Sequence, residues 1–193
     1  MKPGKTPKSH KTDRRTLHTR DLLGDALIAL MQEKPFDEIT VQNVLDRAGV
    51  ARSTFYLHYS NKDDLLLSDI EDFLEKISAA LKRQGGNPKR LLPVQELFAH
   101  IRDARGVHAA FVKSGKIHDF RALGEGLFAR SIDERLQAAG VQMEPVARAA
   151  HAHLLAGSFF SLLDWWIAKG MKSDPREMDD LFHRMAWRGL TVR

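Results

Sequence analysis

Apolar residues recur at helical spacing along most of this chain, and short polar breaks separate the helical runs. Leu23, Leu27 and Leu30 place apolar groups on one face of a first helix, predicted over residues 16–33 and stopped before Pro35. No sustained alternation of polar and β-branched residues indicates a strand. The pattern therefore predicts an all-α protein of about nine helices.

Capping residues and helix-breaking segments define the predicted bounds of the other helices. Thr40 is a suitable N-cap for a short helix over 41–48, and Gly49 is a suitable C-terminal stop. We expect a third short helix over 51–58 and a long fourth helix that ends at a Gly-Gly-Asn-Pro break, residues 85–88. The remaining helices are predicted over 94–105, 107–113, 118–139, 145–169 and 175–190.

The net charge of +5 is concentrated at the N-terminus. Residues 1–20 contain seven Lys or Arg and one Asp, whereas the other 173 residues contain 23 basic and 24 acidic residues. A near-neutral body that carries a basic arm suits a phosphate backbone or an anionic membrane surface. The charge pattern alone leaves these two partners open.

Several function classes are excluded or disfavoured by what the sequence lacks. The absence of Cys excludes disulfides, thiolate nucleophiles and Cys-based zinc sites. The apolar stretch 154–163 is too short to span a bilayer, and the first residues lack the apolar core of a signal peptide, so we expect a cytoplasmic protein without a membrane partner. His151 and His153 fall on different helix faces, which argues against a metal site. We expect no catalytic residue, no metal and no cofactor.

Residues 40–62 carry the most informative motif, TVQNVLDRAGVARSTFYLHYSNK. Two short helices joined through a Gly-containing turn are typical of a helix-turn-helix. The second of these helices gathers hydrogen-bonding side chains on its outer face, while Phe55 and Tyr59, at i and i+4, point to the core. Such a helix fits the major groove, where Arg can fork onto guanine and Ser or Thr can contact either base class.

Residues 15–67 resemble the DNA-binding domain of the TetR/AcrR family of bacterial transcriptional regulators. The resemblance is carried by an ordered set of short motifs: Lys34-Pro35-Phe36, Ile39-Thr40-Val41, Ala48-Gly49-Val50, Ser53-Thr54-Phe55-Tyr56, His58-Tyr59 and Asn61-Lys62-Asp63-Asp64-Leu65. It implies a basic flexible arm over 1–13, a helix-turn-helix domain over 14–62, and an effector-binding and dimerisation domain over 63–193.

The resemblance also implies roles for individual residues. Thr40, Tyr56 and Lys62 would hold phosphates, whereas Gln42 and Arg52 would approach bases together with Ser53. The expected DNA contacts are Arg20, Thr40, Gln42, Arg52, Ser53, Thr54, Tyr56, His58 and Lys62.

The C-terminal part resembles the family's regulatory domain more loosely, through a long penultimate helix that ends in a Trp pair. The family pairs its last two helices with their copies in a dimer, and the expected interface residues are Leu154, Phe159, Leu163, Met178, Leu181, Phe182 and Met185. The family also has an effector cavity among these helices, for which the candidate wall residues are Phe98, Phe111, Phe120, Phe128, Phe160 and Trp165.

These features predict a homodimeric regulator, a repressor, that binds a palindromic double-stranded DNA operator and is released by a small-molecule effector. One alternative is a dimeric DNA-binding regulator that is gated by a protein partner or has no effector. A second is an all-α enzyme built from dispersed residues. The sequence does not identify the effector, the operator, the target genes or the sign of regulation.

Overall fold

The computed structural model describes residues 9–83 and 89–191, and in these ranges all regular structure is helical, as predicted. The helices are α1 Ser9–Glu33, η1 Phe36–Glu38 (a 3-10 helix), α2 Val41–Ala48, α3 Arg52–Tyr56, α4 Lys62–Arg83, α5 Val94–Asp103, α6 Arg105–Lys113, α7 Ile117–Ala138, α8 Pro145–Ala168 and α9 Pro175–Thr191.

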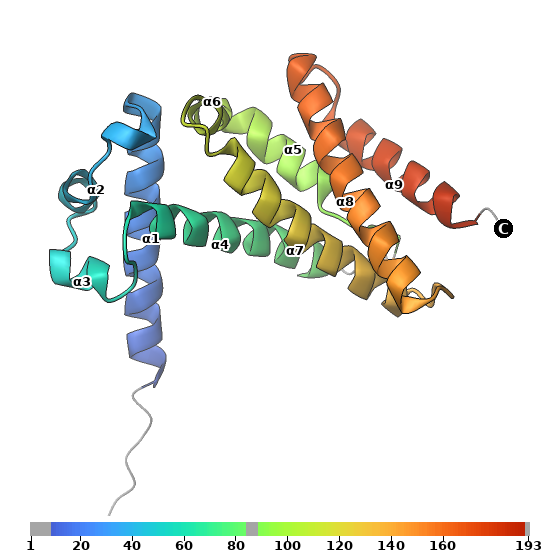
Figure 1. Ribbon diagram of the computed structural model, residues 1–193, viewed down its shortest axis with the longest axis horizontal. Coiled ribbons are helices and arrows are strands. Elements are labelled where there is room, and N and C mark those ends of the chain that lie inside the picture. Colours follow the sequence, from blue (N-terminus) through green and yellow to red (C-terminus); the bar gives the residue numbers. More distant parts are fainter. Residues whose placement is uncertain (1–8, 84–88, 192–193) are drawn as a thin grey trace, which may run out of the picture.

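The helices form two units that α4 connects (Figure 1). The long helix α1 packs against α2 and the start of α4, with α3 beside them, and together they make the N-terminal unit. From there α4 crosses α1 and runs along α7 into the unit formed by α5 to α9. The bundle is closed by α7 against α8 and by α5 against α9. One rigid element therefore touches both units.

Predicted caps account for several of the helix ends. The Thr40 hydroxyl accepts a hydrogen bond from the Asn43 backbone N–H at 3.1 Å, and the Asn43 side chain accepts the Thr40 N–H in return. Gly49 ends α2 with φ 65°, a left-handed conformation that glycine adopts without a Cβ clash. At α9, the Asp174 carboxylate accepts from the Arg176 N–H at 2.8 Å.

Several helix bounds differ from the prediction, and the main differences lie in the N-terminal unit. The first helix begins at Ser9, so residues 9–13 of the predicted arm are helical. The third helix is shorter than predicted, because Leu57 already lies beyond its end. The 3-10 helix after Pro35 was not predicted, since three residues are too few for a periodic signal. The rest of the arm, residues 1–8, and the predicted break at 85–88 lie outside the described residues.

Aromatic side chains fill the core of the C-terminal unit. Phe98, Phe128 and Phe159 are fully buried, and Phe159 meets Phe182 across α8 and α9 at 6.0 Å between ring centroids. Trp166 is also fully buried and donates its indole N–H to the Ser173 carbonyl at 2.9 Å. The Trp pair of the sequence is therefore split between the core and the surface, because Trp165 is 48% exposed.

A buried polar cluster attaches α9 to α5. Arg90 donates to Asp179 at 2.7 Å and to Glu96 at 2.8 Å, and His183 lies 3.3 Å from the Asp179 carboxylate. Burial alone would raise the pKa of Asp179, but hydrogen bonds from His183 and Arg90 outweigh it and lower that pKa to about 2. His183 thus serves in packing α9 onto the bundle.

No helix in the described part of the chain is long and apolar enough to cross a membrane.

Candidate nucleic-acid interface

The outer face of α3 is the candidate surface for reading DNA. Arg52, Ser53 and Tyr56 are exposed, Thr54 and His58 are half-buried, and all five come from one short helix and the residues that follow it. On the opposite side of this helix, Phe55 and Tyr59 are buried, as the i, i+4 spacing predicted. The helix therefore presents donors and acceptors outward from an apolar anchor.

The α2–α3 turn gives this helix its position. The Val50 N–H bonds back to the Leu45 carbonyl at 3.3 Å, which closes the turn after the left-handed Gly49. In Figure 1, α2 and α3 lie on the side of α1 that faces away from the C-terminal bundle. A duplex can therefore approach α3 without meeting α5 to α9.

Two side chains on α3 support each other. The Arg52 guanidinium lies over the Tyr56 ring, 5.6 Å from its centroid, which is a cation–π contact. The stack orders an otherwise flexible side chain and leaves the guanidinium edge free to form hydrogen bonds. Leu57, which our sequence analysis did not single out, is 79% exposed directly after this helix. Its exposure adds an apolar group next to the polar face.

Two predicted contacts on α2 are also accessible. Thr40 is exposed, and since its oxygen already accepts from Asn43, its hydroxyl proton is left to donate to a phosphate. Gln42 is exposed and donates to Asp46 at 2.7 Å within the same helix. A base would have to compete with Asp46 for that amide.

Arg20 forms hydrogen bonds within the protein. Its guanidinium donates to the Tyr59 hydroxyl at 3.1 Å, to Ser68 at 2.8 Å and to Asp72 at 2.8 Å. These bonds connect α1 to α4 and to the end of the α3 segment. In this structure the half-buried Arg20 therefore holds helices together, and its DNA contact stays a prediction.

Lys62 is likewise engaged within the protein. Its ammonium donates to the carbonyls of Phe36 and Ile39, at 2.6 and 2.8 Å, and lies 4.4 Å from the centroid of the buried Phe36 ring. It therefore satisfies the free carbonyls around η1, and its predicted phosphate contact would have to use the remaining ammonium N–H. The sequence did not indicate this internal role, because the 3-10 helix that presents those carbonyls was not foreseen.

The junction between the two units is built around the same ring. Lys116, just before α7, lies 4.8 Å from the centroid of Phe36 and forms an ion pair with Asp63 of α4 at 2.7 Å. The pairing with Asp63 raises the pKa of Lys116, so this residue stays charged. The start of α7 is thereby attached to the first turn of α4.

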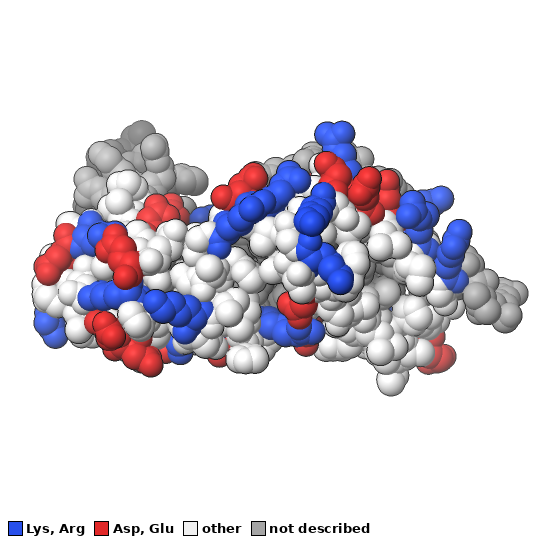
Figure 2. Space-filling model, turned by 90° about the horizontal axis from the view of Figure 1, so that it is seen from above, with Lys and Arg blue, Asp and Glu red and all other residues white. Residues whose placement is uncertain are grey.

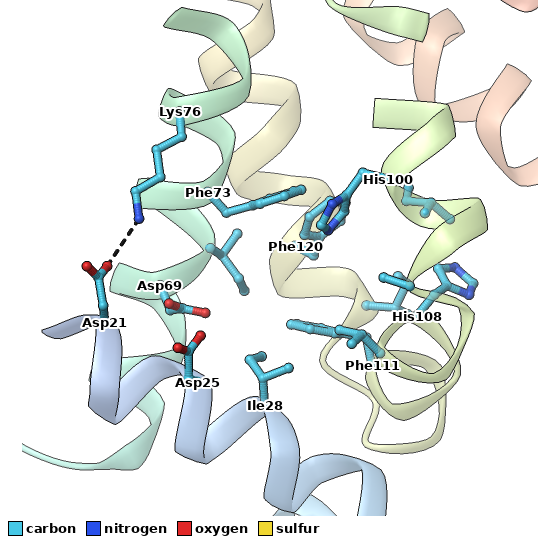
Figure 3. A pocket seen from close by; sticks show the side chains of 15 residues that line it. Asp21, Asp25, Ile28, Asp69, Phe73, Lys76, His100, His108, Phe111 and Phe120 are labelled. Carbon is cyan, nitrogen blue, oxygen red and sulfur yellow. Dashed lines mark hydrogen bonds and ion pairs between the residues drawn. The ribbon is translucent and has the colours of Figure 1, made fainter. Parts of the chain in front are cut away.

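A cavity of about 310 Å³ lies where α1 meets α4 and the C-terminal helices (Figure 3). Phe73, Phe111 and Phe120 supply aromatic walls, and Asp25 of α1 and Asp69 of α4 face each other at one side. Phe111 and Phe120 are among the residues that the sequence analysis proposed for the effector wall. Aliphatic side chains complete the wall, among them Ile28, Ile70, Ile101, Val107 and Ile117.

The other four predicted wall residues do not line this cavity. Phe98 and Phe128 are sealed in the core, Phe160 faces a smaller cavity of about 150 Å³, and Trp165 is on the surface. Sequence reasoning took aromatics as the only signal and therefore missed Asp25 and the other polar wall residues: Asp21, Asp69, Lys76, His100 and His108.

The predicted dimer residues divide between the surface and the core of a single chain. Leu154 and Met185 are 72% and 63% exposed, whereas Phe159, Leu163 and Phe182 are buried within the chain. Met178 is buried too, and Leu181 is half-buried. This corrects the interface assignment for the four buried residues, because their side chains are already covered by other helices of the same chain.

Lys and Arg side chains alternate with Asp and Glu on the face shown in Figure 2. No broad area of one sign covers that face, which agrees with the near-neutral count for residues 21–193.

Comparison with known proteins adds an independent observation about the N-terminal unit. Residues 23–68 match the family described as bacterial regulatory proteins, tetR family. YxbF of Bacillus subtilis, an uncharacterised helix-turn-helix transcriptional regulator, is 36% identical over 70 residues, which are 36% of this chain and 18% of that protein. The chain thus covers less than a fifth of the length of this curated relative.

Solved structures match almost the whole chain in fold. A TetR transcriptional regulator from Streptococcus agalactiae has a TM-score of 0.60 and 24% identity, covering 93% of this chain and 99% of its own. FadR of Thermus thermophilus, a transcriptional repressor solved in complex with lauroyl-CoA, has a TM-score of 0.61 and 22% identity, covering 90% of this chain and 96% of its own. All three relatives are named as transcriptional regulators, and none as an enzyme.

Proposed function

Because the chain carries a TetR-family DNA-binding domain at residues 23–68, we propose that it is a homodimeric transcriptional repressor that occupies a palindromic operator and leaves it when a small molecule binds. It acts in the cytoplasm, where its double-stranded DNA target is accessible. The observation that carries this proposal is the exposed polar face of α3 on a helix-turn-helix of that family.

The DNA contacts fall into two classes. Arg52 and Ser53, with Thr54 and Gln42, contact base edges in the major groove, where Arg forks onto guanine O6 and N7. Thr40, Tyr56 and His58 contact phosphates and fix the position of α3. Arg20 and Lys62 are left out of both classes, since the protein itself takes up their hydrogen bonds.

A dimer is supported by the outer side of the last two helices. Two contacts align α8 with α9: His151 neighbours Gly189, and Phe159 contacts Phe182. Leu154 lies between the two contacts on α8, and Met185 lies between them on α9. Leu154 and Met185 are therefore at the same level. Both side chains are exposed, and with the half-buried Leu181 and the 48% exposed Trp165 they define the α8–α9 patch. Exposed apolar side chains on two neighbouring helices favour an interface. A twofold axis through it would present two copies of α3 to a palindrome.

The effector site is the cavity between α1, α4, α5, α6 and α7. A ligand there touches both units at once. Ile117 and Phe120, which line the cavity, lie in the first turn of α7, just after Lys116. The Lys116 ammonium contacts Asp63 at the start of α4 and the ring of Phe36 in η1. A ligand that shifts the start of α7 would displace this junction and change the spacing of the two α3 helices. Release then requires that the ligand bind the displaced arrangement more tightly.

The DNA-reading role is tested by Arg52→Ala. We expect this variant to lose roughly 1 to 3 kcal/mol of affinity for the operator, and to lose preference at one base pair in each half-site. Affinity would be measured by fluorescence anisotropy on DNA selected from a random library by the wild-type chain, and on unselected DNA.

Arg176→Ala is the matched control, because it removes the same charge from an exposed site at the start of α9. It should leave operator affinity unchanged. Equal losses on selected and unselected DNA for Arg52→Ala would contradict the base-reading role. The proposed effector is dispensable in this test, so a regulator gated by a protein partner would give the same result.

A further inference from the structure

The cavity at the α1–α4 junction is apolar on one side and acidic on the other. Phe73, Phe111 and Phe120 form the apolar side, while Asp21 and Asp25 project from α1 and Asp69 from α4 (Figure 3). Asp21 forms an ion pair with Lys76 at 3.2 Å, the one cation that lines the cavity. The polar contacts of the described residues include no hydrogen bond or ion pair to the carboxylates of Asp25 or Asp69.

The other titratable groups in the wall do not offset these carboxylates. Burial lowers the pKa of His100. Burial also lowers the pKa of His108, although the charge of Asp164 acts in the opposite direction. Both imidazoles are therefore neutral at physiological pH. With Lys76 matched to Asp21, the lining keeps two negative charges in excess. They face a space whose opposite walls are aromatic.

The two carboxylates are held close to each other. Asp69 packs against the α1 backbone at Gly24, where a Cβ would lie 2.2 Å from its Oδ1 oxygen. Its pKa is raised to about 6 by burial and by the neighbouring charge of Asp25. The two carboxylates therefore repel each other across the contact of α1 with α4, Lys76 offsets only part of this effect, and a cation between them would relieve it.

From this geometry we infer that the cavity binds an organic cation with an apolar or aromatic body, such as an amphiphilic quaternary or protonated amine. The cationic end lies between Asp25 and Asp69, and the body lies against Phe73, Phe111 and Phe120. Aromatic faces also attract a quaternary ammonium directly. This inference rests on the proposed effector role of the cavity, and it names the chemical class of the effector.

An anionic amphiphile fits this cavity poorly. The Thermus relative was solved with lauroyl-CoA, which is an anionic ligand, whereas the lining of this cavity carries an excess of carboxylates. The difference between the two ligand classes is therefore a difference in charge rather than in chain length.

The test uses three probes that share a ten-carbon chain: decyltrimethylammonium, decanol and decanoate, each below its micellar concentration. Binding to the full-length protein is measured by isothermal titration calorimetry in the absence of DNA. We expect the cation to bind roughly tenfold more tightly than decanoate, with decanol between them.

Asp69→Asn should reduce that preference about fivefold, and Asp25→Asn, at a more exposed site, about twofold. Asp37→Asn, an exposed aspartate on η1, is the control and should leave the preference unchanged. Phe73→Leu should weaken binding of the cation more than binding of decanol, which a loss of apolar area alone would not do.

Equal affinities for the three probes would overturn the inference, as would a preference for the cation that survives both aspartate substitutions. Because the titration contains no DNA, its failure leaves the DNA-reading role of α3 intact. Conversely, a protein that binds the cation but selects no DNA sequence would overturn the proposed function and leave this site standing.

Discussion

Basic side chains of the N-terminal unit either face solvent, where DNA can reach them, or form hydrogen bonds that stabilise the fold. Residue type alone does not show which of these roles a side chain has. Arg52 and Lys62 are both basic and both belong to the motif that predicted DNA binding. Arg52 is exposed on α3, whereas the Lys62 ammonium lies between two backbone carbonyls. Which task a basic residue has depends on acceptors contributed by distant segments, and for Lys62 those acceptors lie more than 20 positions away along the chain.

Lys62→Ala is therefore expected to act on stability. The substitution leaves the carbonyls of Phe36 and Ile39 without their donor, and hydrogen bonds to a charged group contribute about 1.5 to 3 kcal/mol each in net terms. Because Lys62 is only half-buried, water partly replaces the lost donor, and we expect the free energy of unfolding to fall by less than this sum, roughly 1 to 3 kcal/mol in urea denaturation.

Lys113→Ala, at an exposed position on α6, controls for the loss of a lysine. Unchanged stability of Lys62→Ala, combined with a smaller salt dependence of DNA binding, would restore Lys62 to the phosphate contacts.

Asp69 should make the protein less stable as the pH rises. Burial and the charge of Asp25 raise its pKa from 3.8 to about 6, with smaller additions from Asp72 and Asp21 and an opposing effect of Lys76. Between these two pH values the folded state binds a proton that the unfolded chain has lost. The free energy of unfolding therefore falls as the pH rises through this window, and the full cost is present above pH 6.

Asp69→Asn removes this cost. We expect it to raise the free energy of unfolding by about 2 kcal/mol near neutral pH and to flatten its change between about pH 4 and pH 6. Thermal denaturation across this range measures both effects, with Asp37→Asn as the control. A variant whose stability keeps the wild-type pH dependence would show that Asp69 is not the titrating group.

At the scale of helices, the sequence predicted most elements because their ends carry local signals. α2 and its capping residues were predicted at their observed bounds, since Thr40 and Gly49 act through their own backbone neighbourhood. The early start of α1 and the 3-10 helix at Phe36 lack such signals. Periodicity also gave no means of deciding which apolar face of α8 or α9 another chain covers.

Substitutions in the exposed α8–α9 patch test the dimer more directly than substitutions of the predicted interface residues that are buried. Leu154→Glu places a charge at the centre of that patch, and we expect a folded monomer with an unchanged circular dichroism spectrum. Sedimentation velocity would measure the change in mass. Phe182→Glu would instead disrupt the core, because Phe182 is buried within its own chain.

Val112→Glu is the matched control for this substitution. Val112 is 52% exposed on α6, away from the α8–α9 patch, so a charge there should leave the oligomeric state unchanged. A dimer that persists in Leu154→Glu but is lost in Val112→Glu would move the interface to α6.

At the scale of the whole molecule, the account depends on one rigid helix and one cavity. α4 begins in the N-terminal unit and extends along α7 (Figure 1), and side chains from both units line the cavity. The sequence predicted α4 as one long helix, and its candidate wall residues included Phe111 and Phe120, which line this cavity. It did not predict the acidic side of the cavity, because Asp25 and Asp69 meet only through the crossing of α1 and α4, which no local pattern encodes.

The central claim is that two α3 helices, carried by a dimer, read a palindrome. Selection of DNA from a random library by the full-length protein, followed by sequencing of the retained fragments, tests it most directly. We expect an inverted repeat whose half-site centres lie about 34 to 36 Å apart, or a multiple of one helical turn, and whose enrichment at one base pair of each half-site disappears with Arg52→Ala. Retained DNA without a shared sequence, or an inverted repeat that Arg52→Ala selects equally well, would contradict it.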